Sequence, residues 1–536
     1  MNKIILSGLV ILLAFSTTHA QEDDSVKVMA TQPTLPQDPI KCIDMSVSSS
    51  SRAFKSRKVM RYNMWEPIEN DCNLPSGEVP VELINAFDGI SRKNQSSIFD
   101  LIKGNVQISN QVLSPTERQF MHSPFLTPGS SSKIFGCLSG MSYREENFIL
   151  DNVDYFEILT EHLYYIKNEL AYSYHKNGRS YHCDIIKTTS DFDKVMLDPT
   201  RIGWVFSVGG GHTLGNYLYI DQGQHTTPEY LNIVKRNISK LKGRTPIRTD
   251  PEEYLDIPIF SLNFGSFFDD GMTGKASRLS IAEEGAFRTP LNVGGDISPL
   301  GVATISELLT QKDGQRRILI DIAGMSMRAR QWYYEFIKDQ RYRTDTIPII
   351  CLGVGISGLS FKDGSYGNSD KNSLLSHQEA NLAKQDLKNI LASEGLVGIS
   401  LERNKLAGKA FLSRYDNFLP GSANRKRIVV DAIAGNICKV IHSCQNIRAW
   451  DMMSISSNFD THARHFDEYS SSADMVDLYR HLIDFFEDPR DIDGLYTAKE
   501  IKKFMYSYTA EEVVNKIMYE NALAFMKQNM PQDAIK

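Results

Sequence analysis

The stretch Asn292–Leu359 decides the fold that we expect for this chain. It holds SPLG at 298–301 before a helical pattern, the run ILIDI at 318–322, a second helical pattern, and the run IPIICL at 347–352. Both runs are short and almost wholly apolar, which is typical of parallel strands covered on both faces. A strand, a helix and a strand in about 35 residues make a βαβ unit, and enzymes built from such units place their chemistry at the C-terminal strand ends. These two ends read DIAG and CLG, so they offer few side chains for chemistry.

Similar strand-like runs recur along the chain, with helical patterns between many of them. The predicted strands are 105–109, 133–138, 203–208, 257–262, 318–322, 347–352, 395–401 and 452–457. The main predicted helices are 151–174, 379–392, 425–443, 475–486 and 497–526. Eight strands with intervening helices predict an α/β fold, a (β/α)8 TIM-like barrel, with an open doubly wound sheet as the alternative.

The N-terminal region has the pattern of a targeting segment. Residues 1–20 combine Lys3, an apolar run at 4–15 and a small-residue cleavage site ending at Ala20, which predicts a cleaved signal peptide and a periplasmic or extracellular location. We interpret residues 21–95 as an extended leader and linker, because 31–39 is rich in proline and 48–51 is a serine run. The barrel domain is then expected at 96–530.

Composition limits the partners. No other apolar run is long enough for a transmembrane span, and a net charge of −6 without a long basic block does not suggest a nucleic acid partner. Seven cysteines are present, and Cys42–Cys72 and Cys438–Cys444 are the pairs to test for disulfides. No C-x-x-C pair occurs, which argues against a zinc site built from cysteines.

The order of several motifs resembles one family, the membrane (renal) dipeptidases, which are zinc metallopeptidases with a TIM-like barrel. VFSVGGGH at 205–212 is similar to the family's strand that ends in Glu-Gly-Gly-His, and PIICLG at 348–353 to its Pro-Ile-Ile-x-Ser-His. SSNFD at 456–460 is similar to Gly-Ser-Asp-Phe-Asp. Three further parts of the chain are similar to motifs of the family. They are the helix start at 298–301 with the strand end at 321–324, the helix residues 381–386 with the strand at 395–399, and residues 521–523 of the last predicted helix. The resemblance covers about residues 104–530 and implies a metal-dependent hydrolase type of barrel.

The same resemblance implies that the metal ligands are replaced. The family holds two zinc ions with a His-x-Asp pair on the first strand, a bridging Glu and two strand-terminal His, while an Asp contacts substrate. The counterparts of these ligands are Gln107 and Ser109 for the pair, Gly209 for the Glu, and Gly324 and Gly353 for the two His; Asn458 replaces the Asp. Zinc needs imidazole, thiolate or carboxylate donors, so we expect no metal cofactor.

Four polar residues near the expected mouth are candidates for binding a ligand: His212, Asp321, Asn458 and Asp460. Each also has a structural interpretation, as a hydrogen-bonded loop or strand-end residue. The alternative is a non-standard zinc site made by His212, His462 and His465, although loop histidines exposed to solvent are the simpler interpretation of the last two.

Three hypotheses for function follow. The first is an exported membrane-dipeptidase-like protein, a non-catalytic pseudo-peptidase whose pocket binds a peptide, a small molecule or a partner protein. The second is an active metal-dependent dipeptidase or amidohydrolase with a non-standard metal site. The third is an exported interaction or adhesion protein that uses the leader. The resemblance also makes a homodimer plausible.

Overall fold

Eight parallel strands close into a barrel in the computed structural model of this chain. In barrel order they are β1 (Cys42–Val47), β2 (Val106–Leu113), β5 (Arg201–Gly209), β8 (Ile259–Asn263), β9 (Leu319–Asp321), β10 (Ile350–Val354), β11 (Leu396–Ile399) and β12 (Met453–Ile455). Each strand runs parallel to the next, and β12 returns to β1 where Ile455 lies opposite Asp44. The predicted (β/α)8 barrel is therefore confirmed, and the open sheet is excluded.

The structure describes residues 40–57, 63–68, 94–121, 136, 139–151, 154–215, 226–249, 251–276, 294–311, 316–339, 345–361, 373–461 and 463–532. One compact unit extends from Ile40 to Lys536. The predicted signal peptide lies outside the described residues, as does nearly all of the predicted strand 133–138, of which only Gly136 is described, in a helical conformation.

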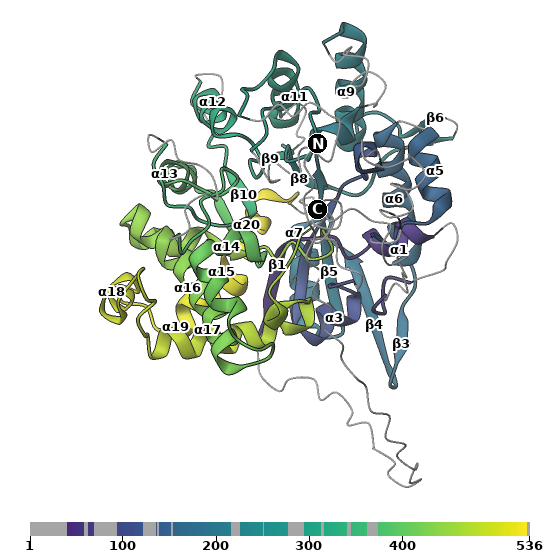
Figure 1. Ribbon diagram of the computed structural model, residues 1–536. Coiled ribbons are helices and arrows are strands. Elements are labelled where there is room, and N and C mark those ends of the chain that lie inside the picture. The colour runs from purple at the N-terminus through teal and green to yellow at the C-terminus, as the bar shows by residue number, and fades with distance from the viewer. Residues whose placement is uncertain are drawn as a thin grey trace, which may run out of the picture. The chain divides into compact units, whose positions relative to one another are not determined.

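Helices that lie between successive strands, or follow the last one, surround the barrel (Figure 1). They are α1 (Ser51–Ser56), α3 (Ile98–Lys103), α5 (Tyr143–Asp151), α6 (Tyr155–Glu169), α7 (Thr189–Leu197), α9 (Pro228–Leu241), α11 (Pro299–Leu309), α12 (Met327–Ile337), α13 (Lys384–Ala392), α14 (Arg403–Leu406), α15 (Lys409–Asp416), α16 (Ala423–Cys444), α17 (Met475–Glu487), α18 (Ala498–Phe504), α19 (Ala510–Asn515) and α20 (Asn521–Asn529). An antiparallel hairpin of β3 (Tyr174–Lys176) and β4 (Arg179–Ile185) extends the sheet from β5. The short pair β6 (Arg248–Thr249) and β7 (Glu252–Glu253) is separate.

The first barrel strand differs from the prediction. We expected the barrel to begin at 105–109, but β1 lies inside the segment interpreted as a leader, and the predicted strand belongs to β2, the second strand. The serine run after β1 is not a linker either. The Ser48 hydroxyl donates to Val112 O at 2.8 Å, and the hydroxyls of Ser49 and Ser96 lie 3.2 Å apart. These hydrogen bonds satisfy buried serines, which is why the run packs as part of the fold.

One apolar cluster joins the strands to two helices. Its strand members include Ile43, Met45, Ile108, Val205, Leu319, Ile350, Leu352 and Leu396, and Phe192 and Val195 of α7 and Phe525 and Met526 of α20 also belong to it. Full burial of such side chains contributes roughly 1.5–3 kcal/mol each. The C-terminal helix is therefore an integral part of the barrel core.

Several motif residues turn out to hold the scaffold. Asn381 accepts a hydrogen bond from Gly355 N and donates to Ser376 O and Lys405 O. Asn521 donates to Trp450 O and Met453 O, which ties α20 to the start of β12. These side chains form hydrogen bonds with buried backbone groups of the loops. A structural role therefore explains why Asn381 and Asn521 match the motifs of the family, without a catalytic one.

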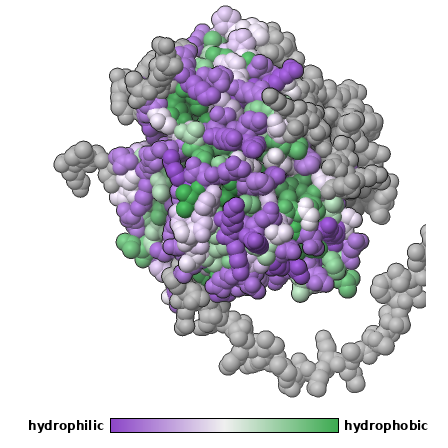
Figure 2. Space-filling view, turned by 90° about the vertical axis from the view of Figure 1, so that its left-hand side faces the viewer, coloured by the Kyte–Doolittle hydropathy of each residue, from purple (hydrophilic) through white to green (hydrophobic). Residues whose placement is uncertain are grey.

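Figure 2 shows mostly hydrophilic residues on the left-hand face of Figure 1, with hydrophobic residues in small patches between them. Among the described residues, no helix is both long and apolar enough to cross a membrane.

The cysteines differ from the prediction. Cys42, Cys438 and Cys444 are free thiols, so the predicted disulfide Cys438–Cys444 is wrong, and Cys72 lies outside the described residues.

Candidate functional site

The C-terminal ends of all eight strands meet at one end of the barrel, which we call the mouth. Because the strands are parallel, the mouth carries the last residue or two of every strand and the loops that follow. The polar residues there come from different strands: Ser46, Asn263, Asp321, Ser400, Ser457 and Asn458. All are buried except Asn263, which is partly buried.

Gly353 and Asn458 fit against each other at the mouth. The Asn458 amide donates to Gly353 O at 3.0 Å and accepts from the Ser46 hydroxyl at 2.9 Å. Gly353 has a φ of +65°, and a Cβ added there would lie 2.1 Å from Asn458 Oδ1. The Asn458 amide therefore occupies the space that a side chain at position 353 would need.

Of the other predicted metal positions, Gly209 is crowded, and Gln107 and Ser109 lie on a different strand from the one expected. A Cβ at Gly209 would lie 3.0 Å from Ser114 Cβ, which is tighter than ordinary contact. Gln107 and Ser109 lie on β2 and not on the first strand, so their proposed match to the first-strand ligand pair of the family is wrong. The Ser109 hydroxyl accepts from Gln111 Nε2 at 2.9 Å.

The residues at these positions do not fit the dinuclear zinc centre of the family. Gly209, Gly324 and Gly353 have no donor side chain, and Asn458 and Ser46 offer an amide and a hydroxyl that already bond each other. Within the described ranges, no three His, Cys, Asp or Glu side chains are grouped so that they could hold a metal ion.

The histidines proposed for an alternative metal site have separate partners. His212 follows β5 in a short 3-10 turn, where its Nε2 donates to Pro115 O at 3.0 Å and its buried Nδ1 has no partner among the described residues. Both nitrogens of His465 are engaged, by Ser457 O at 2.8 Å and Gln95 Nε2 at 3.0 Å. Burial lowers the pKa of His465 to about 4, so its ring is neutral near pH 7. His462 lies outside the described residues.

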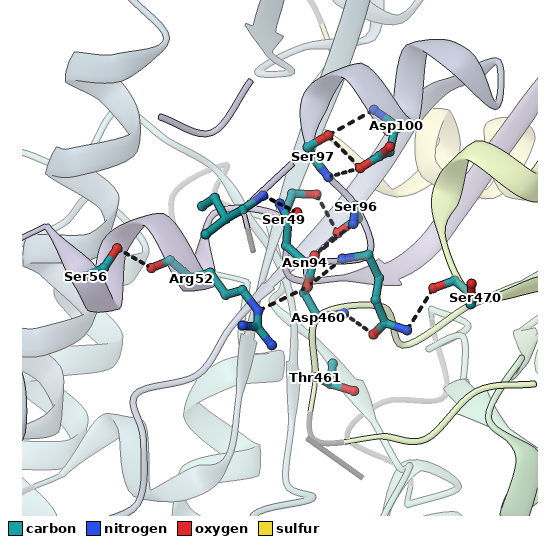
Figure 3. Close-up of polar contacts among 12 residues, drawn as sticks. Ser49, Arg52, Ser56, Asn94, Ser96, Ser97, Asp100, Asp460, Thr461 and Ser470 are labelled. Carbon is teal, nitrogen blue, oxygen red and sulfur yellow. Dashed lines mark hydrogen bonds and ion pairs between the residues drawn. The ribbon is translucent and has the colours of Figure 1, made fainter. Parts of the chain in front are cut away.

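Asp460 is the centre of a buried polar cluster (Figure 3). Its carboxylate accepts from Gln95 N at 2.8 Å, from Ser96 N at 2.9 Å and from the Ser96 hydroxyl at 2.6 Å. The Arg52 guanidinium lies 3.9 Å away. Burial raises the pKa of Asp460 to about 6, against the opposing effect of Arg52 and these hydrogen bonds. The cluster joins the β12 loop to the segment before α3.

Asp321 has a comparable supporting position at the end of β9. It accepts from Ala323 N at 3.0 Å and Leu352 N at 3.1 Å through one oxygen, and from Asn263 Nδ2 at 2.8 Å through the other. Of the four predicted ligand-binding residues, Asn458 and Asp460 lie two residues apart in one loop. His212 and Asp321 contact other parts of the mouth.

Sequence reasoning missed a fifth polar residue, Asp44 on β1. It is fully buried, and it accepts from Ser46 N at 3.1 Å, Ser457 N at 2.9 Å and the Ser457 hydroxyl at 2.5 Å. Burial raises the pKa of Asp44 to about 6, although these hydrogen bonds oppose the shift. A polar residue inside an apolar strand run was the available signal, but β1 had not been recognised as a strand.

We predict that Asp44→Asn removes a pH dependence of stability. A carboxyl whose pKa is raised to about 6 in the folded protein binds its proton more tightly than in the unfolded chain. Its contribution to stability is therefore present below pH 4 and is lost as the pH rises through 6. Asparagine is uncharged at every pH. Its Oδ1 can accept from the two backbone N–H groups, while its Nδ2 would donate to the Ser457 hydroxyl and so reverse that hydrogen bond. Urea unfolding should show the variant gaining roughly 2 kcal/mol relative to the wild type between pH 4 and pH 8. An equal difference at both pH values would contradict this.

Comparisons with known proteins give structural neighbours only. No protein-family model matches the chain, and no curated protein sequence matches it. Among solved structures, the chain is similar to a metallopeptidase from Rhodobacter sphaeroides liganded with a phosphinate mimic of the dipeptide L-Ala-D-Ala. The identity is 11%, 92% of this chain and 100% of that chain are covered, and the TM-score is 0.48.

Two further neighbours have similar values. The dipeptidase AC, a metallopeptidase of family M19, has 11% identity with 92% and 99% coverage and a TM-score of 0.47. The probable dipeptidase PvdM from Pseudomonas aeruginosa has 13% identity with 91% and 95% coverage and a TM-score of 0.46. These neighbours are dipeptidases and metallopeptidases, the class of protein that the sequence motifs resemble. The barrel itself is established by the strand pairings, and the neighbours' activities are properties of those proteins.

Proposed function

We propose that this chain is a divergent relative of the membrane dipeptidases that has lost the dinuclear zinc centre and does not hydrolyse peptides. One observation carries the proposal: the Asn458 amide fills the space beside Gly353 where the family has a strand-terminal His. Loss of the His alone would leave an empty space beside position 353. Here the Asn458 amide fills that space, and its hydrogen bonds to Ser46 and to Gly353 O require that position 353 has no side chain. The polar groups that remain at the mouth are buried and hydrogen-bond one another.

The retained function that these polar groups support best is binding of a small polar ligand, such as a peptide, without turnover. Amide, hydroxyl and carboxylate groups from several strands converge at the mouth, and such groups orient polar ligands in barrel proteins. We further propose that the protein is exported through the signal peptide at residues 1–20. A homodimer is a proposal that rests on the family resemblance alone.

A hydrolysis assay tests the loss of catalysis. The full mature chain, purified free of metal, is incubated with a panel of dipeptides that includes L-Ala-D-Ala, with and without added Zn²⁺. We expect no turnover above the uncatalysed rate under either condition, because a water nucleophile at neutral pH needs a bound metal in this class of reaction.

The control identifies the source of any turnover. Hydrolysis that is abolished by a chelator, and that His212→Ala or His465→Ala also abolishes, would contradict the proposal and support the alternative metal site. Chelator-sensitive hydrolysis that survives both substitutions would also contradict the proposal and remove those two histidines as ligands. A trace contaminant would be exposed by its separation from the protein on a sizing column.

A further inference from the structure

A small cavity lies beside the mouth, between α1 and the loop after β2. It is lined by Ser51, Phe54 and Lys55 of α1, by Ser114, Pro115 and Thr116 after β2, and by residues of α5 and α6 that include Glu145 and His162. The volume open to water centres is about 10 Å³. A space of this size holds about one water molecule or one small ion.

Lys55 brings a positive charge to this cavity without a direct partner. Among the described residues, its ammonium has no hydrogen bond or ion pair, whereas the neighbouring Arg57 pairs with Glu145 at 2.9 Å and with Glu161 at 2.5 Å. The acid nearest the cavity is therefore already neutralised by another cation. The Lys55 side chain is half-buried, and an ammonium that is partly desolvated without a partner carries an unfavourable desolvation energy.

A second polar group in the cavity is also unsatisfied. The hydroxyl of Thr116, a residue that is only 5% exposed, has no hydrogen-bond partner within the described part of the chain. The side chains of Ser51 and Ser114 line the same space. His162 is held by the Ser50 hydroxyl at 2.9 Å and stacks on Phe54 with ring centroids 4.0 Å apart. Burial, with Arg57 and Lys55 adding to it, keeps the pKa of His162 well below its usual value, so the ring brings no charge.

The charges around Lys55 come from three elements. Burial, with Arg52 on the same helix adding to it, lowers the pKa of Lys55 to about 8, while Asp460 and Glu145 act in the opposite direction. The ammonium is thus less stable in the unliganded protein than in water. A ligand that stabilises the charged ammonium of Lys55 would therefore gain binding free energy from this contact.

We propose that Lys55 and Thr116 form a binding site for a small monovalent anion, either a halide or the carboxylate group of an organic acid. An anion would accept hydrogen bonds from the ammonium and the threonine hydroxyl, the two groups that have none. The size of the cavity excludes bulky anions. This inference goes beyond the proposed function, because it holds whether or not the chain hydrolyses peptides.

Thermal unfolding of the full chain tests the site. Sodium chloride, formate and acetate are titrated separately, with the ionic strength kept constant by a bulky sulfonate salt. We expect the midpoint of the wild type to rise with at least one small anion, as ligand linkage requires. A response to chloride alone indicates a halide, and a response to formate or acetate indicates a carboxylate ligand.

Variants separate the site from general salt effects. Lys55→Met should weaken the anion response at least about tenfold, and Thr116→Val should weaken it several-fold, because each removes one hydrogen bond to an anion. Lys338→Met is the matched control, since Lys338 is exposed and pairs with Glu335 at 3.0 Å. It should respond as the wild type does. If Lys55→Met does not fold, the anion response of the Thr116→Val midpoint alone tests the site.

A second readout follows Lys55 itself. Reductive ¹³C-methylation should give one lysine signal that titrates near pH 8 and that Lys55→Met lacks. The titration should move to higher pH when the anion binds. The proposal is overturned if no small anion differs from the sulfonate, or if Lys55→Met and Thr116→Val respond as the wild type does.

Discussion

Replacing Gly353 with alanine is expected to lower the free energy of unfolding by about 3 kcal/mol or more. Two effects add. The backbone at Gly353 has a φ of +65°, a left-handed conformation that costs an alanine roughly 1–2 kcal/mol. The added Cβ would lie 2.1 Å from Asn458 Oδ1 and 2.4 Å from Nδ2, so the amide would have to leave its hydrogen bonds to Ser46 and to Gly353 O.

A second substitution and a control separate these effects. In an Asn458→Gly background the clash is absent, so Gly353→Ala should then cost only about 1–2 kcal/mol, and the coupling of the pair should exceed about 1 kcal/mol. Gly421→Ala is the matched control. Gly421 has a φ of +75° with no atom within 4 Å of an added Cβ, so it tests the backbone effect alone. If Gly353→Ala costs no more than Gly421→Ala in urea unfolding, the fitted arrangement of Gly353 and Asn458 is disproved.

Asp386→Asn is expected to destabilise the protein by about 3–5 kcal/mol, the cost of breaking a buried ion pair by removing one partner. Asp386 and Arg330 are both fully buried, and Arg330 Nε lies 3.2 Å from the carboxylate. The same carboxylate accepts from the Tyr334 hydroxyl at 2.6 Å and from Ala383 N at 2.8 Å. Asparagine keeps the size of the side chain but leaves the guanidinium charge of Arg330 without its counter-charge.

The control for this prediction is an ion pair at the surface. Glu335→Gln removes the partner of Lys338, an exposed pair, and should change the urea midpoint very little, by less than about 0.5 kcal/mol. Replacing Arg330 and Asp386 together by Met and Leu should recover much of the stability that Asp386→Asn loses. Similar midpoints for Asp386→Asn and Glu335→Gln would show that the buried pair does not connect α12 to α13 as described.

The barrel was predictable because most of its strands are buried on both faces. Runs such as 318–322 and 347–352 are apolar for this reason, and the structure places β9 and β10 within or beside them. β1 was missed because Asp44 and Ser46 interrupt its apolar pattern, and because the proline-rich and serine-rich segments around it resemble a linker. Only the hydrogen bonds to Ser457 and Asn458, more than 400 residues away, show why a strand can hold these polar side chains.

The candidate site was predictable in one respect only. Gly209, Gly324 and Gly353 can be recognised from sequence as positions without donors, because a missing side chain is visible in the residue type. That Asn458 occupies the space at Gly353 is a long-range contact, and no local pattern reports it. The cavity at Lys55 was missed for the same reason, since its walls come from α1, the β2 loop, α5 and α6. His465 is buried and doubly hydrogen-bonded, so the expectation of an exposed loop histidine was wrong.

The amount of zinc that the barrel binds distinguishes a lost metal centre from a retained one. Equilibrium dialysis of the metal-free chain against Zn²⁺ measures the stoichiometry of binding, and X-ray data collected at the zinc edge then locate any bound ion. We expect no tightly bound zinc and no anomalous signal at the mouth, because the groups there cannot supply imidazole or carboxylate ligands in the required arrangement. Two zinc ions per chain beside Gly209 and Gly353 would contradict this expectation.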